Sequence, residues 1–555
     1  LQIYVGALLV RDLIYEEFEL QRARLNLREY LRAGESFLFR ALESLHRSVF
    51  RHELLHRSRH LSFDFNFCAK RCCGKGDFNC NVQVMAIANQ IRMFCFNDFN
   101  IKITSWSTTG SDFTTSGQGT DGAAVPTYGL VASLTGNNTL TGTLSLTSGG
   151  GGTTMGAFAG STLTFAGTVK AAAGQTVRDL NLYGAGNFVF ASSGSFLDGD
   201  AGAGTMLIVG NYLVASPGST TILSSANQYT GRTVVQNGGT LNVAQFADVN
   251  TVSSIGKGSA AGAATDLALD GGTLQYTGSS AQSTNRLFSI GNQGGIFDAS
   301  GAVTAASLKF TGTGAMGFNG YTSAGAYAAE TGDRTITLTG SNLGDNTIAL
   351  AVGQSTGLTS IFKTGAGRWI LAGTNTYTGG TFVGGSSTAA SASASGPIKA
   401  GSSTAFGTNT IKVWANGVLD LNGQTLSNAL TLNGTGISSG GALINSSATS
   451  ATYAGLITLG SASSVVGGTG SIAVTNVGSI TGSGFGLTLG GDAGGTLSSV
   501  LATSAGTLTK EGAGTWTLAG ANTYTGGTTI SAGTLALGAS NRLADTGAVT
   551  VSGTG

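Results

Sequence analysis

One short segment, RHELLHRSRH at residues 51–60, has the residue types and spacing of a zinc protease. His52 and His56 are four residues apart, so on a helix both would lie on one face and could bind a zinc ion. Glu53 would then act as the general base. No recognisable third-ligand motif follows, and residues 1–100 show no other sign of a protease. We therefore interpret the match as accidental and keep these three residues only as candidate metal ligands.

Two further groups could bind metals. Four cysteines lie close together, but their gaps do not give the paired Cys-x-x-Cys spacing of a zinc site, so we interpret them as incidental. Asp198 and Asp200 lie in a Gly-rich turn, yet a calcium-binding β-roll needs a longer repeated pattern. We expect an ordinary turn there, and we predict no cofactor. The four cysteines are Cys68, Cys72, Cys73 and Cys80.

Carbohydrate chemistry is the other alternative. Glu330, Asp333 and Arg334 form the densest charge cluster after residue 101, and such groups could line the groove of a polysaccharide-degrading enzyme. We favour a solvated loop. Trp369 and Trp516 could stack on sugars if they were exposed, but each alternates with a nearby leucine and is expected in the core.

Composition divides the chain into two parts at about residue 101. Residues 1–100 hold all 4 His, all 5 Cys and only four of the 90 glycines. We expect this part to be helical or disordered, and translated upstream DNA is an alternative to native protein. The net charge of +1 gives no indication of a nucleic-acid partner. Because the chain starts at Leu1 and stops abruptly in VSGTG, we interpret it as an incomplete reading frame.

Residues 101–555 alternate apolar and polar side chains, as in GTWTLAG and GAVTVSG, with Gly and Asn between the runs. This period of two predicts short half-buried strands. Short strands cannot bury a core singly, so we expect them to stack coil upon coil as a right-handed parallel β-helix. Val549 and Val551 are expected to point inward. A β-propeller is the alternative, but its blades need about 40–50 residues.

The same sequence recurs along this region. KTGAGRWILAGTNTYTGGTFV at 363–383 returns as KEGAGTWTLAGANTYTGGTTI within 510–537, and Trp369 and Trp516 are 147 residues apart. A weaker copy lies at 222–243. In each copy we expect the Asn-Thr-Tyr string to form a turn, because Asn tolerates the left-handed conformation.

The string Trp…Asn-Thr-Tyr-Thr-Gly-Gly-Thr closely resembles the autotransporter-associated β-strand repeat of bacterial surface proteins. The resemblance implies export, a β-helical stalk or passenger, and no catalytic residues. It also marks the residues that should have a structural role in the repeats: Trp369, Asn375, Tyr377, Gly379, Gly380, Trp516, Asn522, Tyr524, Gly526 and Gly527.

These features predict an exported, cell-surface or secreted bacterial protein without enzymatic activity, used for display or adhesion. Partners would be glycans or proteins on host or neighbouring cells, with no nucleic acid. Membrane contact would come only through an anchor or translocator outside these 555 residues. The alternative is a β-helical polysaccharide-degrading enzyme.

Overall fold

In the computed structural model, the described residues are 101–103, 113–115, 131–133, 135–146, 153–172, 178–191, 196–198, 205–210, 219–224, 226–321, 327–391, 393–543 and 547–554. Nearly all described strands pair in parallel with a strand one coil earlier and one coil later. Ile361, for example, pairs with Thr381, twenty residues further on. Parallel pairing of this kind, with the chain returning after each turn, is a β-helix, so the predicted fold is confirmed. The segment predicted for residues 1–100 lies outside the described residues.

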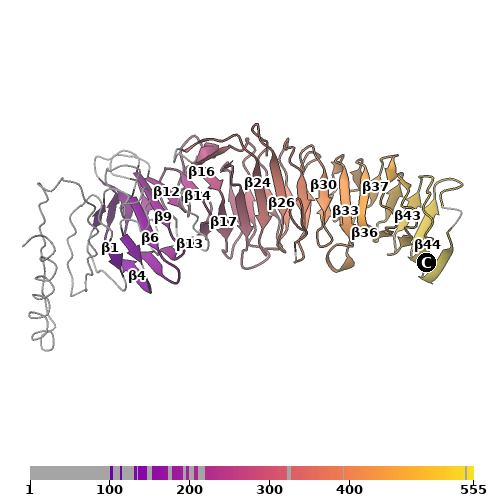
Figure 1. Cartoon of the computed structure of the whole chain (residues 1–555), viewed down its shortest axis with the longest axis horizontal. Coiled ribbons are helices and arrows are strands. Elements are labelled where there is room, and N and C mark those ends of the chain that lie inside the picture. Colours follow the sequence, from indigo (N-terminus) through magenta and orange to yellow (C-terminus); the bar gives the residue numbers. More distant parts are fainter. Residues whose placement is uncertain are drawn as a thin grey trace, which may run out of the picture. The chain divides into compact units, whose positions relative to one another are not determined.

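Each coil contributes strands to up to three faces, in a fixed order. β30 on the first face is followed by β31 on the second and β32 on the third, and β33 then returns to the first. In Figure 1 the labelled strands of the first face, such as β24, β26, β30 and β33, follow one another in sequence order.

The first face is one parallel ladder: β4 (Asn137–Leu140), β7 (Thr162–Phe165), β10 (Asn187–Phe190), β13 (Thr220–Leu223), β15 (Thr240–Val243), β17 (Gly272–Tyr276), β20 (Gly295–Ala299), β24 (Arg334–Thr339), β26 (Thr359–Lys363), β28 (Thr381–Val383), β30 (Ile411–Val413), β33 (Leu430–Gly434), the start of β36 (Ile457–Gly467), β38 (Ser479–Ile480) and β41 (Val500–Leu501).

The second face contains β2 (Phe113–Thr115), β5 (Leu144–Leu146), β8 (Val169–Ala171), β11 (Phe196–Leu197), β18 (Gln282–Thr284), β21 (Leu308–Phe310), β25 (Asn346–Ile348), β27 (Trp369–Leu371), β29 (Ile398–Ala400), β31 (Leu419–Asp420), β34 (Leu443–Asn445), the end of β36, β39 (Leu487–Gly490), β42 (Leu508–Lys510), β44 (Thr528–Ala532) and β46 (Val549–Thr554).

The third face contains β1 (Ile101–Ile103), β3 (Val131–Ser133), β6 (Thr153–Ala157), β9 (Arg178–Tyr183), β12 (Thr205–Val209), β14 (Thr233–Gln236), β16 (Leu267–Asp270), β19 (Ser289–Ile290), β32 (Thr425–Leu426), β35 (Ala451–Tyr453), β37 (Ile472–Val474), β40 (Gly495–Leu497), β43 (Thr515–Leu518) and β45 (Thr534–Leu537).

In the described part of the chain, two short 3₁₀ helices, η2 (Ala264–Asp266) and η3 (Ile437–Ser439), interrupt the coils. An antiparallel hairpin formed by the described strands β22 (Asn319–Tyr321) and β23 (Tyr327–Ala329) also leaves the coil path.

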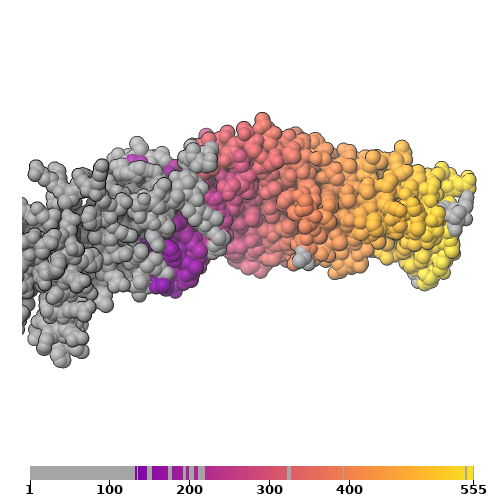
Figure 2. Space-filling view, viewed as in Figure 1, coloured from indigo at the N-terminus to yellow at the C-terminus, as the bar shows by residue number. Residues whose placement is uncertain are grey.

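The core is a set of columns of inward side chains. Because parallel partners point to the same side of a sheet, Leu241, Leu274, Phe297 and Leu338 follow one another in register, and all four are fully buried. Each buried leucine or phenylalanine of such a column contributes about 1.5–3 kcal/mol relative to an exposed one. Most outward positions beside them are polar, such as Asn242, Gln275 and Thr337, and Ile296 is an apolar exception. Figure 2 shows the resulting surface, on which residues of successive coils lie side by side.

The prediction that Val549 and Val551 are buried is wrong. They are 51% and 61% exposed, although they pair in register with Thr528 and Ile530 of β44. β46 is the last strand that the structure describes, and within the described residues no further coil packs against its inward side chains. Trp516 and Leu518, which have coils on both sides, are fully buried as predicted.

Candidate functional site

The lysine, tryptophan, asparagine and tyrosine of the two strong repeats are buried, and so is the threonine after each glycine pair. These residues connect one coil to the next. We call this group of Lys, Trp, Asn, Tyr, Gly and Thr positions the repeat cluster. It has closely similar geometry in residues 363–383 and 510–537, and part of it is present in 222–243.

The tyrosine of each repeat cluster is buried, with its hydroxyl on a threonine four residues later. The hydroxyl-to-hydroxyl distances are 2.6 Å for Tyr377 and Thr381, and 2.5 Å for Tyr524 and Thr528. Tyr229 and Thr233 of the weaker copy are 2.6 Å apart. Burial raises the pKa of Tyr377 and Tyr524 above the ordinary value, so these phenols stay protonated.

The asparagine of each repeat cluster joins three coils through its side chain. The Asn375 carboxamide accepts from Val352 N at 2.8 Å and donates to Ala405 O at 2.6 Å. Asn522 accepts from Leu501 N and donates to Arg542 O, both at 2.7 Å. The buried carboxamide thus satisfies backbone groups in the coils before and after its own.

The expectation that these asparagines adopt the left-handed conformation is wrong. Positive φ occurs at Asn237, Asn250, Asn422 and Asn541, and not at Asn375 or Asn522. In the repeat cluster the requirement for Asn comes from its donor and acceptor, which reach opposite neighbours. These two partners lie in other coils, so the turn preference of Asn could not predict them.

Trp369 and Trp516 are fully buried, and each indole donates to a carbonyl oxygen of the preceding coil. The distances are 2.8 Å from Trp369 Nε1 to Thr339 O, and 2.9 Å from Trp516 Nε1 to Gly490 O. Rings in this position have no face open to a sugar, so they act in packing and in coil-to-coil hydrogen bonding.

The lysine that begins each strong repeat was not singled out from the sequence, although its recurrence 147 residues later was visible. Lys363 and Lys510 are both fully buried. Lys363 Nζ donates to Thr364 O at 2.6 Å and Gly365 O at 2.8 Å, while Lys510 Nζ donates to Glu511 O at 2.8 Å and Gly512 O at 2.7 Å. Each turn therefore wraps its carbonyls around its own lysine. Because burial penalises the charge, the pKa of Lys363 is lowered to about 7.

The two glycines of each pair are required for different reasons. A Cβ on Gly379 would lie 2.4 Å from Thr359 O, and one on Gly526 would lie 2.3 Å from Ala505 O, so coils approach too closely for any side chain. Gly380 and Gly527 have φ of +93° and +88°, which L-residues with side chains rarely adopt.

The charge cluster at 330–334 is not a solvated loop, so that expectation is wrong for Arg334. Its guanidinium is buried and donates to Ile290 O at 2.7 Å, Gly332 O at 2.9 Å and Ser355 Oγ at 2.8 Å. Asp333 is exposed and accepts from Leu358 N at 2.8 Å. The Arg334 guanidinium is already bonded to acceptors of the protein, and the Asp333 carboxylate holds a turn. These two groups therefore do not form the accessible charged groove that a polysaccharide-degrading enzyme needs.

The remaining candidates offer no reactive arrangement in the described part of the chain. Asp198 accepts from Thr205 N at 2.8 Å and Thr230 N at 2.9 Å, as a turn residue does. Asp200, the four cysteines, His52, Glu53 and His56 lie outside the described residues. Where the structure is described, no three His, Cys, Asp or Glu side chains are grouped to hold a metal ion.

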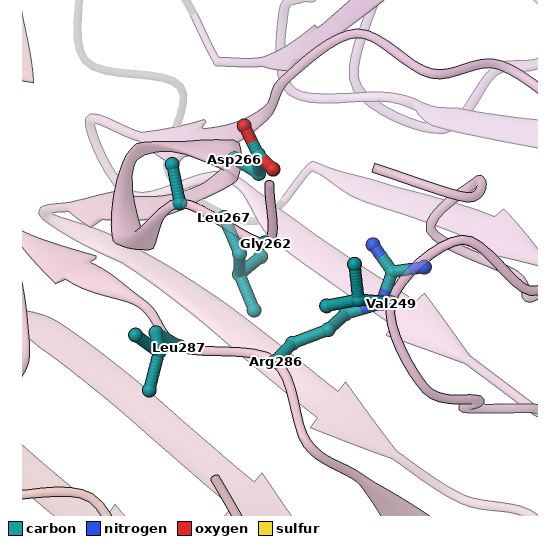
Figure 3. A pocket seen from close by; sticks show the side chains of 7 residues that line it. Val249, Gly262, Asp266, Leu267, Arg286 and Leu287 are labelled. Carbon is teal, nitrogen blue, oxygen red and sulfur yellow. The ribbon is translucent and has the colours of Figure 1, made fainter. Parts of the chain in front are cut away.

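A small hollow near η2 is the site drawn in Figure 3. Apolar side chains dominate its lining, together with Asp266 and Arg286. Arg286 donates to Gly256 O at 2.8 Å and Lys257 O at 2.6 Å, and Asp266 accepts from Ser259 N at 3.0 Å. Both charged groups thus hold the loop at 245–262 in place.

No helix in the described ranges has the length and apolar character needed to cross a membrane.

Comparison with known proteins adds the family context. Residues 218–243, 361–385 and 508–537 match the family model of the passenger-associated-transport-repeat. These ranges contain the three repeat copies predicted from the sequence.

A curated relative is the Adhesin BmaC autotransporter of Brucella suis biovar 1 (strain 1330). It is 36% identical over 173 residues, which cover 31% of this chain and 5% of the relative. The chain therefore matches only a small part of that protein's length. No solved structure matches. The predicted resemblance to autotransporter passenger repeats is confirmed, and it identifies a cell-surface or secreted bacterial protein.

Proposed function

We propose that this chain, which carries the passenger repeats of bacterial autotransporters, is the β-helical scaffold of an exported surface protein and holds adhesive segments away from the cell. Its role is structural. The surface that contacts other cells would be built from outward side chains and from insertions between coils.

The proposal rests on one observation, which is where the buried polar side chains of the repeat cluster form their hydrogen bonds. The buried polar groups of the cluster, namely the Asn375 carboxamide, the Trp369 indole and the Tyr377 hydroxyl, all bond to other groups of the protein itself. A repeated sequence with this property fixes the stacking of coils and leaves outward positions free to vary. A display scaffold needs this combination.

The adhesive part of the proposal draws on the relative, whose name describes an adhesin. Glycans or proteins on host or neighbouring cells are the proposed partners. Weak contacts repeated along a scaffold would add by multivalency.

The test compares a bacterium that naturally produces the protein with a deletion strain and a complemented strain. Antibodies against residues 393–543 should label intact producing cells, and protease added outside should remove the label. The producing and complemented strains should bind more cells or immobilised glycans than the deletion strain does. Labelling only after lysis would refute export, and equal binding by all three strains would refute adhesion. Release of sugar products by the purified chain would instead favour the enzyme alternative.

A further inference from the structure

The hairpin of β22 and β23 covers an apolar patch on the outer side of the third face. Ile208, Val234 and Ala268 are in-register neighbours on β12, β14 and β16 that point outward, yet they are at most 3% exposed. Tyr321 and Tyr327 of the hairpin pack against them. The hairpin is therefore docked on the coil by side-chain contacts, in addition to its chain connections.

Polar contacts add to this docking. Tyr327 Oη donates to Thr265 O at 3.2 Å, and the Arg232 guanidinium lies 3.7 Å from the centre of the Tyr327 ring. At the hairpin base, Asp270 of β16 accepts from Tyr321 N at 3.1 Å and also from Gln293 N at 2.9 Å. Glu330, directly after β23, accepts from Asn292 N at 2.6 Å.

The two carboxylates at the hairpin base are crowded together. A Cβ built on Gly320 of β22 would lie 2.5 Å from Glu330 Oε2 and 2.7 Å from Asp270 Oδ2, so both oxygens lie against the same backbone position. Within the described residues, the ion pairs are Arg368–Asp345 and Lys399–Asp420, and neither involves Asp270 or Glu330. Two neighbouring carboxylates without an ion-pair partner repel each other when both are ionised.

The surrounding charges do not cancel this repulsion. Arg334 of β24 attracts both carboxylates, but its guanidinium is engaged with carbonyl oxygens and is shared with Asp333. Arg232 and Asp266 influence the pKa of Tyr327, and neither is a cause of the pKa shifts of Asp270 and Glu330. Burial raises the pKa of Asp270 above its ordinary value, and burial together with the charge of Asp270 does the same for Glu330.

We propose that docking of the β22–β23 hairpin on the third face depends on proton uptake by the Asp270–Glu330 pair. The hairpin docks more tightly when the pair holds a proton, and less tightly when both carboxylates are ionised. The patch of Ile208, Val234 and Ala268 is then intermittently uncovered near neutral pH.

The direction follows from linkage. In the open state the carboxyl groups are in water and have ordinary pKa values, whereas in the docked state their pKa values are raised. The docked state therefore binds protons more tightly. Docking weakens as the pH rises from the ordinary pKa values of the carboxyl groups through their raised pKa values. The docking constant falls about tenfold for each unit by which docking raises a pKa.

Hydrogen exchange read by mass spectrometry on the full 555-residue chain tests the proposal, at pH 4.5 and pH 7.5, with rates corrected for intrinsic exchange. Amides of 319–321 and 327–330 should be better protected at pH 4.5, while peptides from β26 and β28 should change little. The variant E330Q keeps an acceptor for Asn292 N but removes one charge. It should raise hairpin protection at pH 7.5 and reduce the pH dependence.

The matched control is D345N, which removes a carboxylate of the exposed pair with Arg368. It should leave hairpin exchange unchanged. Hairpin protection that is equal at both pH values, or greater at pH 7.5, would overturn the proposal. So would lower protection in E330Q than in the unmodified chain at pH 7.5, because that result would show a net attractive role for the Glu330 charge.

Discussion

Replacing Asn375 by alanine tests whether the repeat cluster connects the coils. The side chain is 2% exposed and serves Val352 N in one coil and Ala405 O in another. Alanine would leave both groups buried without a partner. At about 1–3 kcal/mol for each unsatisfied group, N375A should cost about 2–6 kcal/mol.

The matched control is N409A. Asn409 also donates to a backbone carbonyl, Thr378 O at 2.6 Å, but it is exposed. Water replaces a lost bond at such a position, so the expected change is within about 0.5 kcal/mol. Comparing the two variants therefore shows whether the loss of stability depends on burial of the hydrogen bond or only on its removal.

The assay must report local stability, because long repeat arrays often do not unfold in a single step. Hydrogen exchange of peptides from 346–352 and 398–413 measures opening of the two coils that Asn375 joins. A cost of 2 kcal/mol corresponds to exchange about 30 times faster, since 1.4 kcal/mol is a factor of ten. Exchange in N375A within threefold of the unmodified chain, or equal effects of N375A and N409A, would refute the reasoning.

Three other predictions concern the same cluster. Because the pKa of Lys363 is about 7 when folded and about 10.4 when unfolded, the unfolded chain binds more protons in between, so stability should rise with pH up to about 10.4. Urea unfolding at pH 7.5, 8.5 and 9.5 should show this rise, and K363M should lose part of it. If stability rises with pH as steeply in K363M as in the unmodified chain, the lowered pKa of Lys363 is contradicted. W516F should lose about 1 kcal/mol for its carbonyl bond and W516A about 3–5 kcal/mol, measured by denaturation, and a W516F variant as stable as the unmodified chain would contradict the indole bond. G379A, with an oxygen 2.4 Å from the new Cβ, should lower the unfolding temperature, whereas G353A, with nothing nearer than 3.6 Å, should not.

Local patterns were enough to predict the strands and the inward side chains of most coils. Alternation in GTWTLAG places Trp516 and Leu518 on one side of a strand, and both are buried. The period of two is a property of extended backbone, so it is present in the sequence before any neighbour is known. The recurrence of a 21-residue string similarly predicted a stacked repeat.

The errors arose where a neighbouring coil decides the outcome. Arg334 was expected in water, but it is buried because the preceding coil supplies the Ile290 carbonyl and the following one the Ser355 hydroxyl as acceptors. Val549 has the pattern of a core residue, yet it is exposed in β46, the last strand that the structure describes. Lys363 is buried, although a lysine ordinarily predicts a surface position, because its own turn folds around the ammonium group.

The sequence by itself determined that short strands of period two recur, and that one string returns every 147 or 148 residues. Only the tertiary structure decided where each copy lies. Thr221, Trp369 and Trp516 hold the same place in the three copies, but their strands β13, β27 and β43 belong to the first, second and third faces. The repeat interval exceeds a whole number of coils by one face. Coil length is set by turns, insertions and pairing registers between distant residues, so the rotation of the copies around the core follows from contacts that no single segment contains.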